Sequence, residues 1–429
     1  MTITFIAHST PEPAFYGALA AILAELRALP LCHLPVSYDS KHFINSRQYI
    51  SPQGYQMTSG LLWLERLTGR GAGAEFELGS LINRAVKEDI VVPLNQPLCS
   101  PCYATMIQRI RENGIAIESL QVVKNQDRYQ LEDCVSGKVR SNGWTRDNFG
   151  RWVLGGVTQP VMRAGKALRL GILGDFNEHR DSYPATLAAL GDAADALAMN
   201  IEVVYITPNL VSTQLDSRLF DLDGLLLPGI SVQGADNASV SSSSQLAVAR
   251  WALDNQAPVL GINSGMHMMV AALGQKILGD AAVAMPGPST LNALQCSLPL
   301  ADQGMQRGNR KVIFQSGSRM AKMMGKEAQL RYNQRWRLSP QLLDKLACAG
   351  LQVTGSDESG LSAESVELEN HPFFIGVQGH PELQSRRERP HPLLLNFLQQ
   401  VRQINKDRDI SHPALTRSVR LKHPHFLMG

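Results

Sequence analysis

Apolar runs alternate with amphipathic segments from about residue 166 to residue 405. Strands are predicted at Leu168–Leu173, Ile201–Ile206, Gly224–Leu227, Val259–Ile262 and Phe374–Val377, and helices at Tyr183–Ala198, Ser244–Asn255, Met266–Leu273 and Leu393–Val401. This alternation is typical of a doubly wound, mostly parallel α/β sheet with helices on both faces. In such a sheet a ligand is expected at the carboxyl ends of the strands.

The first 165 residues show a weaker pattern. An apolar strand at Ile3–Ala7 and a helix-like stretch at Phe15–Leu29 are followed by polar, glycine-rich sequence. A second strand begins at Asp89 and is followed by an amphipathic helix that ends before Gly114. We therefore expect four parts: an N-terminal segment of unknown fold (1–88), a smaller α/β domain (89–165), the doubly wound domain (166–405) and a basic C-terminal tail (406–429).

One turn dominates the large domain. The apolar run Val259–Ile262 enters the sequence Gly261-Ile262-Asn263-Ser264-Gly265, and a helix-compatible segment follows. This pattern is typical of a nucleophile elbow, in which the middle residue projects above the sheet. Glycine is needed on both sides because a Cβ would clash in so sharp a bend. The following helix N-terminus offers free N–H groups to an anion, so a ligand site is predicted around Asn263.

Four signatures carry a family resemblance. They are Leu170–Phe176, Leu225–Gly229, the elbow and His371–Glu382. In this order and at similar spacing, they resemble the class I glutamine amidotransferase domain of CTP synthase and its stand-alone relatives, across residues 168–401. The resemblance implies that fold, with His380 as the catalytic base and Glu382 as the carboxylate that orients it.

The sequence departs from this family at the nucleophile. The family has a cysteine where this chain has Asn263. A carboxamide is not a usable nucleophile near neutral pH, whereas a base-activated thiolate is. Ile230 stands where the family places a second glycine, and no glutamate that would bind glutamine is evident near Pro286–Thr290. We therefore expect no family-type hydrolysis of glutamine.

The remaining cleft is suited to binding. Asn263 can donate to and accept from a carbonyl group, and the resemblance places Arg331 or Arg335 where the family holds a substrate carboxylate. A small carboxylate or amide is the expected ligand, held by Gly229, Asn263, Ser264 and one of these arginines. Two alternatives stay open: His380 and Glu382 are inherited structure around an inert elbow, or they activate Ser264 or a water molecule for hydrolysis.

A second chemical signal lies upstream. Cys99 and Cys102 form a C-X-X-C motif between a predicted strand and a predicted helix, the thioredoxin-like redox pattern. The segment resembles a glutaredoxin or small redoxin, which implies a thioredoxin-like domain with Cys99 as nucleophile, Cys102 as resolving thiol and Pro160 as the cis-proline beside them. The alternative is a structural pair or half of a zinc site. The neighbouring Cys and His residues fit no standard zinc spacing, so no metal is predicted.

Charge, composition and the lack of certain motifs argue against several classes of function. A formal net charge of +3 over 429 residues favours neither a nucleic-acid partner nor a membrane-surface partner. No apolar run approaches the roughly 18 residues of a spanning helix, and the start lacks a signal peptide's basic region. Six scattered cysteines are no disulfide framework, so we expect a reducing cytoplasm. No Walker motif is present and no cofactor is predicted.

The leading hypothesis is a fusion of two functions. The redox domain exchanges thiols and disulfides with a thiol reductant or a redox partner protein. The amidotransferase-like domain binds its ligand without hydrolysing glutamine, in a setting closer to specialised biosynthesis than to bulk nucleotide metabolism. The alternatives are a non-catalytic scaffold and a hydrolase or amide-transfer enzyme that uses His380. The sequence leaves self-association into a homo-oligomer open.

Overall fold

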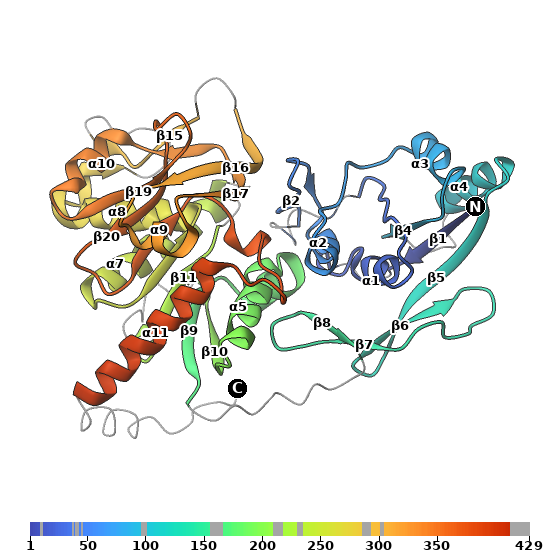
Figure 1. The fold of residues 1–429 in the computed structure, drawn as a ribbon, viewed down its shortest axis with the longest axis horizontal. Coiled ribbons are helices and arrows are strands. Elements are labelled where there is room, and N and C mark those ends of the chain that lie inside the picture. The colour runs from blue at the N-terminus through green and yellow to red at the C-terminus, as the bar shows by residue number, and fades with distance from the viewer. Residues whose placement is uncertain are drawn as a thin grey trace.

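A computed structural model gives the fold of the chain. It describes all residues except 9–11, 37, 39–42, 44–45, 96–100, 155–165, 209–217, 230–234, 285–292, 301–303 and 412–429. Two α/β lobes are present, an N-terminal lobe of residues 1–154 and an amidotransferase-like lobe that begins at Leu168 (Figure 1).

The larger lobe contains a nine-stranded sheet. In spatial order its strands are β10 (Ile201–Ile206), β9 (Leu168–Leu173), β11 (Gly224–Leu227), β12 (Val259–Ile262), β21 (Phe374–Val377), β20 (Ala363–Leu368), β19 (Leu351–Ser356), β16 (Gln306–Phe314) and β17 (Glu327–Gln334). All five predicted strands are confirmed and pair in parallel. The prediction of a mostly parallel sheet is wrong, because the four strands from β20 to β17 pair antiparallel.

Helices cover both faces of this sheet (Figure 1). One face packs against α7 (Ala235–Asp254), α8 (Ser264–Leu278) and α10 (Pro340–Ala347), and the other against α5 (Ala185–Ala196), α9 (Arg319–Met324) and α11 (Pro392–Ser411). Leu225 and Leu227 face the first layer and Leu226 the second, as strand alternation requires. The helix predicted at Ser244–Asn255 begins earlier than expected, since α7 starts at Ala235 and includes the serines at 241–244. Helix α7 packs along α8, and this tertiary contact overrides the weak helix propensity of serine.

The N-terminal lobe is built on a six-stranded sheet. The order is β4 (Ile90–Leu94), β1 (Thr2–Ala7), β5 (Ala116–Asn125), β6 (Arg128–Asp133), β7 (Trp144–Arg146) and β8 (Trp152–Leu154). Strand β1 pairs in parallel with both β4 and β5. The sheet therefore crosses the expected boundary near residue 88, because β1, the first strand of the chain, lies between β4 and β5.

Helices also cover the two faces of the smaller sheet. Helix α1 (Ala18–Leu26) packs on one face, and α3 (Leu78–Ala85) and α4 (Pro101–Glu112) pack on the other. Helix α2 (Leu62–Thr68), which follows a short hairpin of β2 (Tyr49–Ile50) and β3 (Gln56–Met57), lies where this lobe meets the larger one (Figure 1).

Charged side chains of α2 cross the interface between the lobes. Arg66 binds Asp192 at 2.5 Å and the Ser385 carbonyl at 2.7 Å, and Glu65 binds Arg331 at 2.7 Å. Asp192 has no exposed side-chain surface and also accepts from Arg151 at 3.1 Å. Loss of one partner of a buried ion pair costs about 3–5 kcal/mol, so these contacts hold the lobes in one arrangement.

Within the described part of the chain, neither ring nitrogen of the buried His8 has a hydrogen-bond partner. It follows β1 and is 2% exposed, and its backbone N–H donates to the Leu94 carbonyl at 2.8 Å. Burial lowers the pKa of His8 to about 3. The folded protein therefore holds this imidazole neutral, while the unfolded chain takes up a proton below its ordinary pKa of 6.5.

The pH dependence of stability tests this burial. As pH falls below 6.5, proton uptake by the unfolded chain lowers the free energy of unfolding. Between pH 7 and pH 5 the His8 contribution is roughly 2 kcal/mol. We predict that a His8→Phe variant loses about this much of the pH dependence in urea unfolding, while His267 and His391, whose pKa values are also lowered to about 4, keep the remainder. The same pH dependence in variant and wild type would contradict the burial.

Candidate functional site

The turn between β12 and α8 has the geometry of an elbow. Asn263 has φ 50° and ψ −111°, a region that residues other than glycine rarely adopt. Its backbone N–H donates to the Val377 carbonyl at 2.8 Å, and its carbonyl accepts from the His267 N–H at 3.3 Å. A Cβ on Gly265 would collide with the Leu227 carbonyl. The glycine and the flanking hydrogen bonds therefore hold Asn263 in this conformation.

The side chain of Asn263 meets His380. Its Nδ2 lies 3.3 Å from His380 Nε2 and 3.3 Å from the Gln378 carbonyl. On the other side of the ring, His380 Nδ1 lies 2.8 Å from Glu382 Oε1. An ionised Glu382 only accepts, so Nδ1 carries the proton and Nε2 accepts from the asparagine amide. The structure therefore places Glu382 on one side of the His380 ring and the Asn263 carboxamide on the other.

Tyr183 supports the same carboxylate. Its hydroxyl donates to Glu382 Oε1 at 2.9 Å, and Glu382 is 1% exposed. Burial, and then the neighbouring Glu382, raise the pKa of Tyr183 well above its ordinary value. The phenol thus stays protonated and fixes the acceptor that orients His380.

Gly229 packs directly against both His380 and Asn263. A Cβ at this position would lie 2.8 Å from His380 Cε1 and 3.1 Å from Asn263 Cβ. Any other residue would displace the imidazole or the carboxamide. The sequence prediction that Gly229 belongs to the site is consistent with this contact, whereas Ile230 lies outside the described residues.

Ser264 is the first residue of α8 and is partly exposed. Both ring nitrogens of His380 are engaged by Asn263 and Glu382, so the base is not directed at the Ser264 hydroxyl. The Ser264 backbone N–H lies at the N-terminus of the 15-residue helix α8, where the helix dipole favours anions and carbonyl oxygens.

Arg331 makes its contacts away from the elbow. The Arg331 guanidinium is buried and binds Glu65 at 2.7 and 3.1 Å, Asn309 Oδ1 at 2.6 Å and the Ile50 carbonyl. These contacts occupy its donors, so the expectation that Arg331 holds a ligand carboxylate needs correction. Arg335 is exposed. The pKa of Arg307 is lowered mainly by the burial of Arg307 and, to a smaller extent, by the positive charge of Arg335.

A buried network behind the elbow was not predicted. His267 Nε2 lies 2.7 Å from Gln378 Oε1, and its Nδ1 lies 2.5 Å from Ser297 Oγ. Burial lowers the pKa of His267 to about 4, so this ring is neutral near pH 7. The backbone carbonyl of Gln378 also accepts a hydrogen bond from Asn263 Nδ2. The network therefore fixes Gln378, which follows the end of β21, opposite the elbow. Its only sequence signal was the position of His267 four residues after Asn263.

The predicted redox residues are only partly described. Strand β4 ends at Leu94 and α4 begins at Pro101, which places an exposed Cys102 in the first helical turn. Cys99 and Pro160 lie outside the described residues. Within the described part of the chain, no group of three or more His, Cys, Asp or Glu side chains is arranged to hold a metal ion.

Comparisons with known proteins agree with this fold. Residues 179–400 match the family "Glutamine amidotransferase class-I", and this match spans more than half of the chain. The chain therefore belongs to the class-I glutamine amidotransferase family. It is 29% identical over 263 residues to CTP synthase of Sulfurisphaera tokodaii, covering 58% of this chain and 48% of the relative. It is 32% identical over 241 residues to CTP synthase of Flavobacterium psychrophilum, covering 53% and 43%.

A solved structure shows the same fold. The glutaminase domain of Trypanosoma brucei CTPS with bound acivicin superposes with a TM-score of 0.50 at 22% identity, covering 55% of this chain and 94% of that chain. The chain spans less than half the length of the curated relatives given above. Among the described residues, no helix is long and apolar enough to cross a membrane.

Substitution at the elbow tests the site geometry. In an Asn263→Cys variant the new thiol would face His380 Nε2, and a base within hydrogen-bond reach favours the thiolate. We predict that iodoacetamide alkylates residue 263 at pH 6.5 at least about tenfold faster than the exposed Cys348, as measured by peptide mass spectrometry.

The control removes the base. In an Asn263→Cys, His380→Ala variant the rate at residue 263 should fall to that of Cys348. Equal rates with and without His380 would contradict the contact between the two side chains.

Proposed function

We propose that the amidotransferase domain binds a small carboxylate or amide at the Asn263 elbow and does not hydrolyse glutamine by the family's covalent route. The contact between Asn263 Nδ2 and His380 Nε2, 3.3 Å long, carries this proposal. The imidazole has the carboxylate partner of a general base, but the group in front of it is a weakly basic amide that cannot become a thiolate.

The recognition groups are the elbow itself and the start of α8. Asn263 supplies a donor and an acceptor, and the N-terminus of α8 supplies backbone donors with a favourable dipole. Gly229 leaves room beside both side chains. Since Arg331 is engaged by Glu65, the ligand would be held by these neutral donors, which suit a carboxamide as well as a carboxylate.

Calorimetric titration tests this function. The probes are glutarate and glutaramate, a dicarboxylate and its monoamide, which present the two candidate groups without an ammonium group. We expect saturable binding of at least one probe, with thermal stabilisation of the protein. An Asn263→Asp variant places a negative charge at the elbow and should weaken glutarate binding by about tenfold or more.

The matched control is Asn113→Asp, an exposed position at the end of α4 in the other lobe. This variant should bind as the wild type does. Failure of both probes to bind, or equal binding by the two Asp variants, would reject the elbow as the ligand site.

We further propose thiol–disulfide exchange by the N-terminal lobe, with Cys99 as nucleophile and Cys102 as resolving thiol. The observation that favours it is the exposed position of Cys102 in the first turn of the 12-residue helix α4. A helix N-terminus stabilises a thiolate nearby. Reduction of a mixed disulfide by the purified protein should be lost in Cys99→Ser and retained in Cys348→Ser; unchanged turnover in Cys99→Ser would remove this function and favour a non-catalytic scaffold.

A further inference from the structure

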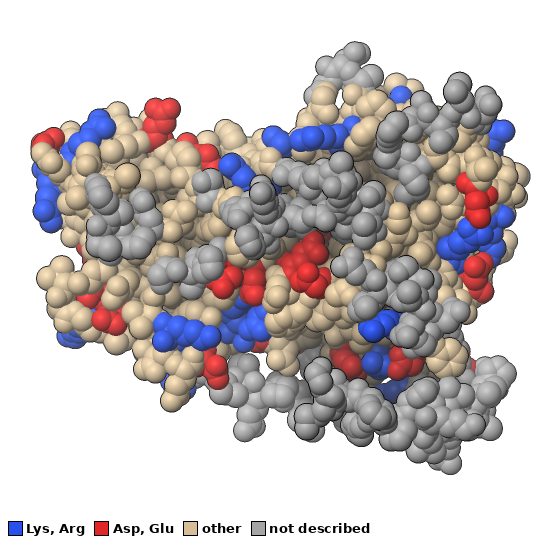
Figure 2. Space-filling view, turned by 180° about the vertical axis from the view of Figure 1, so that it is seen from behind, with Lys and Arg blue, Asp and Glu red and all other residues tan. Residues whose placement is uncertain are grey.

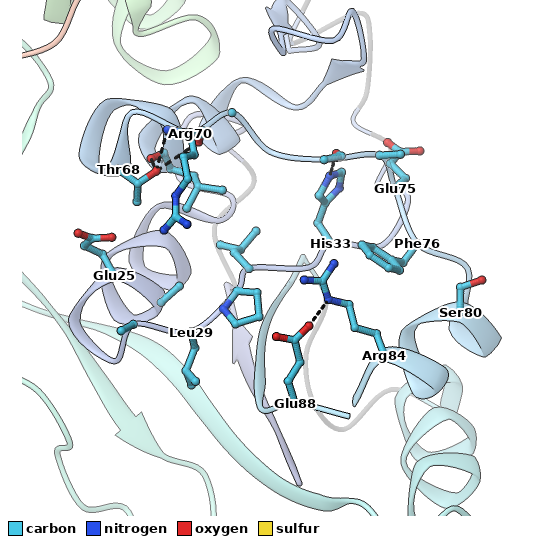
Figure 3. Close-up of a pocket in the computed structure, with 18 of the residues that line it drawn as sticks. Glu25, Leu29, His33, Thr68, Arg70, Glu75, Phe76, Ser80, Arg84 and Glu88 are labelled. Atoms are coloured by element: carbon cyan, nitrogen blue, oxygen red, sulfur yellow. Dashed lines mark hydrogen bonds and ion pairs between the residues drawn. The ribbon is translucent and has the colours of Figure 1, made fainter. Parts of the chain in front are cut away.

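A cavity of about 810 Å³ lies in the N-terminal lobe and is lined in part by Leu64 and Thr68 of α2. It is bounded by the end of α1, by α2, by α3 and by the glycine-rich segment that follows α2 (Figure 3). Its volume lies in the range of roughly 300–1,000 Å³ typical of metabolite sites. Neither the family match nor the elbow accounts for it.

Three exposed charges in its wall, those of Glu25, Arg70 and Glu77, have no ion-pair or hydrogen-bond partner among the described residues. Arg84 binds Glu88 at 2.9 Å, and Glu75 binds Arg47 at 3.1 Å. Among the described residues no side chain or backbone group pairs with the Arg70 guanidinium or the Glu25 carboxylate. Figure 3 shows both on the same side of the cavity, Arg70 from the segment after α2 and Glu25 from α1.

Polar and apolar residues line the cavity in similar numbers. The apolar part includes Ala28, Leu29, Pro30 and Leu31, which follow α1, and, farther along, the ring of Phe76. A ligand that suits this wall carries a carboxylate for Arg70, an ammonium for Glu25 and an uncharged body. This is the chemistry of a free amino acid with an apolar or neutral side chain.

Helix α2 lies between this cavity and the loop that carries His380 and Glu382. Leu64 and Thr68 line the cavity, whereas Glu65 and Arg66 leave the helix on the interface side. Arg66 holds the Ser385 carbonyl, three residues beyond Glu382. A displacement of α2 on binding would therefore act directly on the loop that carries His380 and Glu382.

We propose that the cavity binds a free amino acid and that α2 transmits this binding to the loop of residues 380–386. This cavity site is separate from the ligand site proposed at the elbow. The transmission concerns only the mobility of the loop, so it is measurable whether or not a ligand binds at the elbow.

The binding test uses the full chain and calorimetric titration with each common amino acid in turn. At least one should bind with one-site stoichiometry, and its des-amino and carboxamide analogues should bind at least about tenfold more weakly, since each lacks one charge. Arg70→Ala and Glu25→Gln should weaken binding to a similar extent. The controls Arg109→Ala and Glu112→Gln, exposed on α4, should have no effect.

Three results would overturn the binding site. They are the absence of binding by every amino acid at about 10 mM, equal binding by an analogue that lacks one charge, and unchanged affinity in both cavity variants. Arg70→Ala should also leave glutarate and glutaramate binding unchanged, which separates this site from the elbow.

Hydrogen exchange tests the transmission. Peptides that cover residues 380–386 should become at least about twofold more protected when the amino acid binds. In Arg66→Lys, which keeps the charge but not the paired contacts to Asp192 and Ser385, the amino acid should still bind while this protection is lost. Unchanged exchange in the wild type on saturation, or a full response in Arg66→Lys, would reject α2 as the connection.

Discussion

The buried ion pairs of helix α2 are the interaction on which the arrangement of this protein depends. Arg66 binds Asp192 and the Ser385 carbonyl, and Glu65 binds Arg331, so one short helix of the N-terminal lobe fixes an amidotransferase helix, strand and loop. Buried charges tolerate little displacement, because each must keep its partner or be left unpaired in a low-dielectric interior. The orientation of the His380–Glu382 loop is therefore set partly by residues outside the family fold.

The same pairs bear on the amidotransferase site. Arg331 pairs with Glu65 across the interface, and the Asn263 carboxamide faces His380. His380, Glu382 and the Tyr183 hydroxyl contact one another behind this carboxamide. These contacts support the proposal that the elbow holds a carbonyl ligand rather than attacking one.

The sequence predicted the elements whose signal is local. Five parallel strands and the elbow followed from apolar runs and glycines, and the His380–Glu382 pair followed from a resemblance along one continuous segment. The antiparallel half of the sheet was missed because β16 mixes exposed and buried positions irregularly, and because β20, although buried throughout, contains Glu364, Ser365 and Glu367. The partners of Arg331 could not be predicted, since Glu65 is 266 residues away in sequence and the contact exists only after the lobes pack.

We propose that this chain keeps an amidotransferase elbow without the family's covalent chemistry. Ammonia release from glutamine by the purified full chain tests it most directly, with His380→Ala as the background. We predict equal, background release by both proteins, because the group in front of the imidazole is the Asn263 carboxamide. Release by the wild type that disappears in His380→Ala would contradict it, and would assign the hydrolysis to Ser264 or to a water molecule activated by His380.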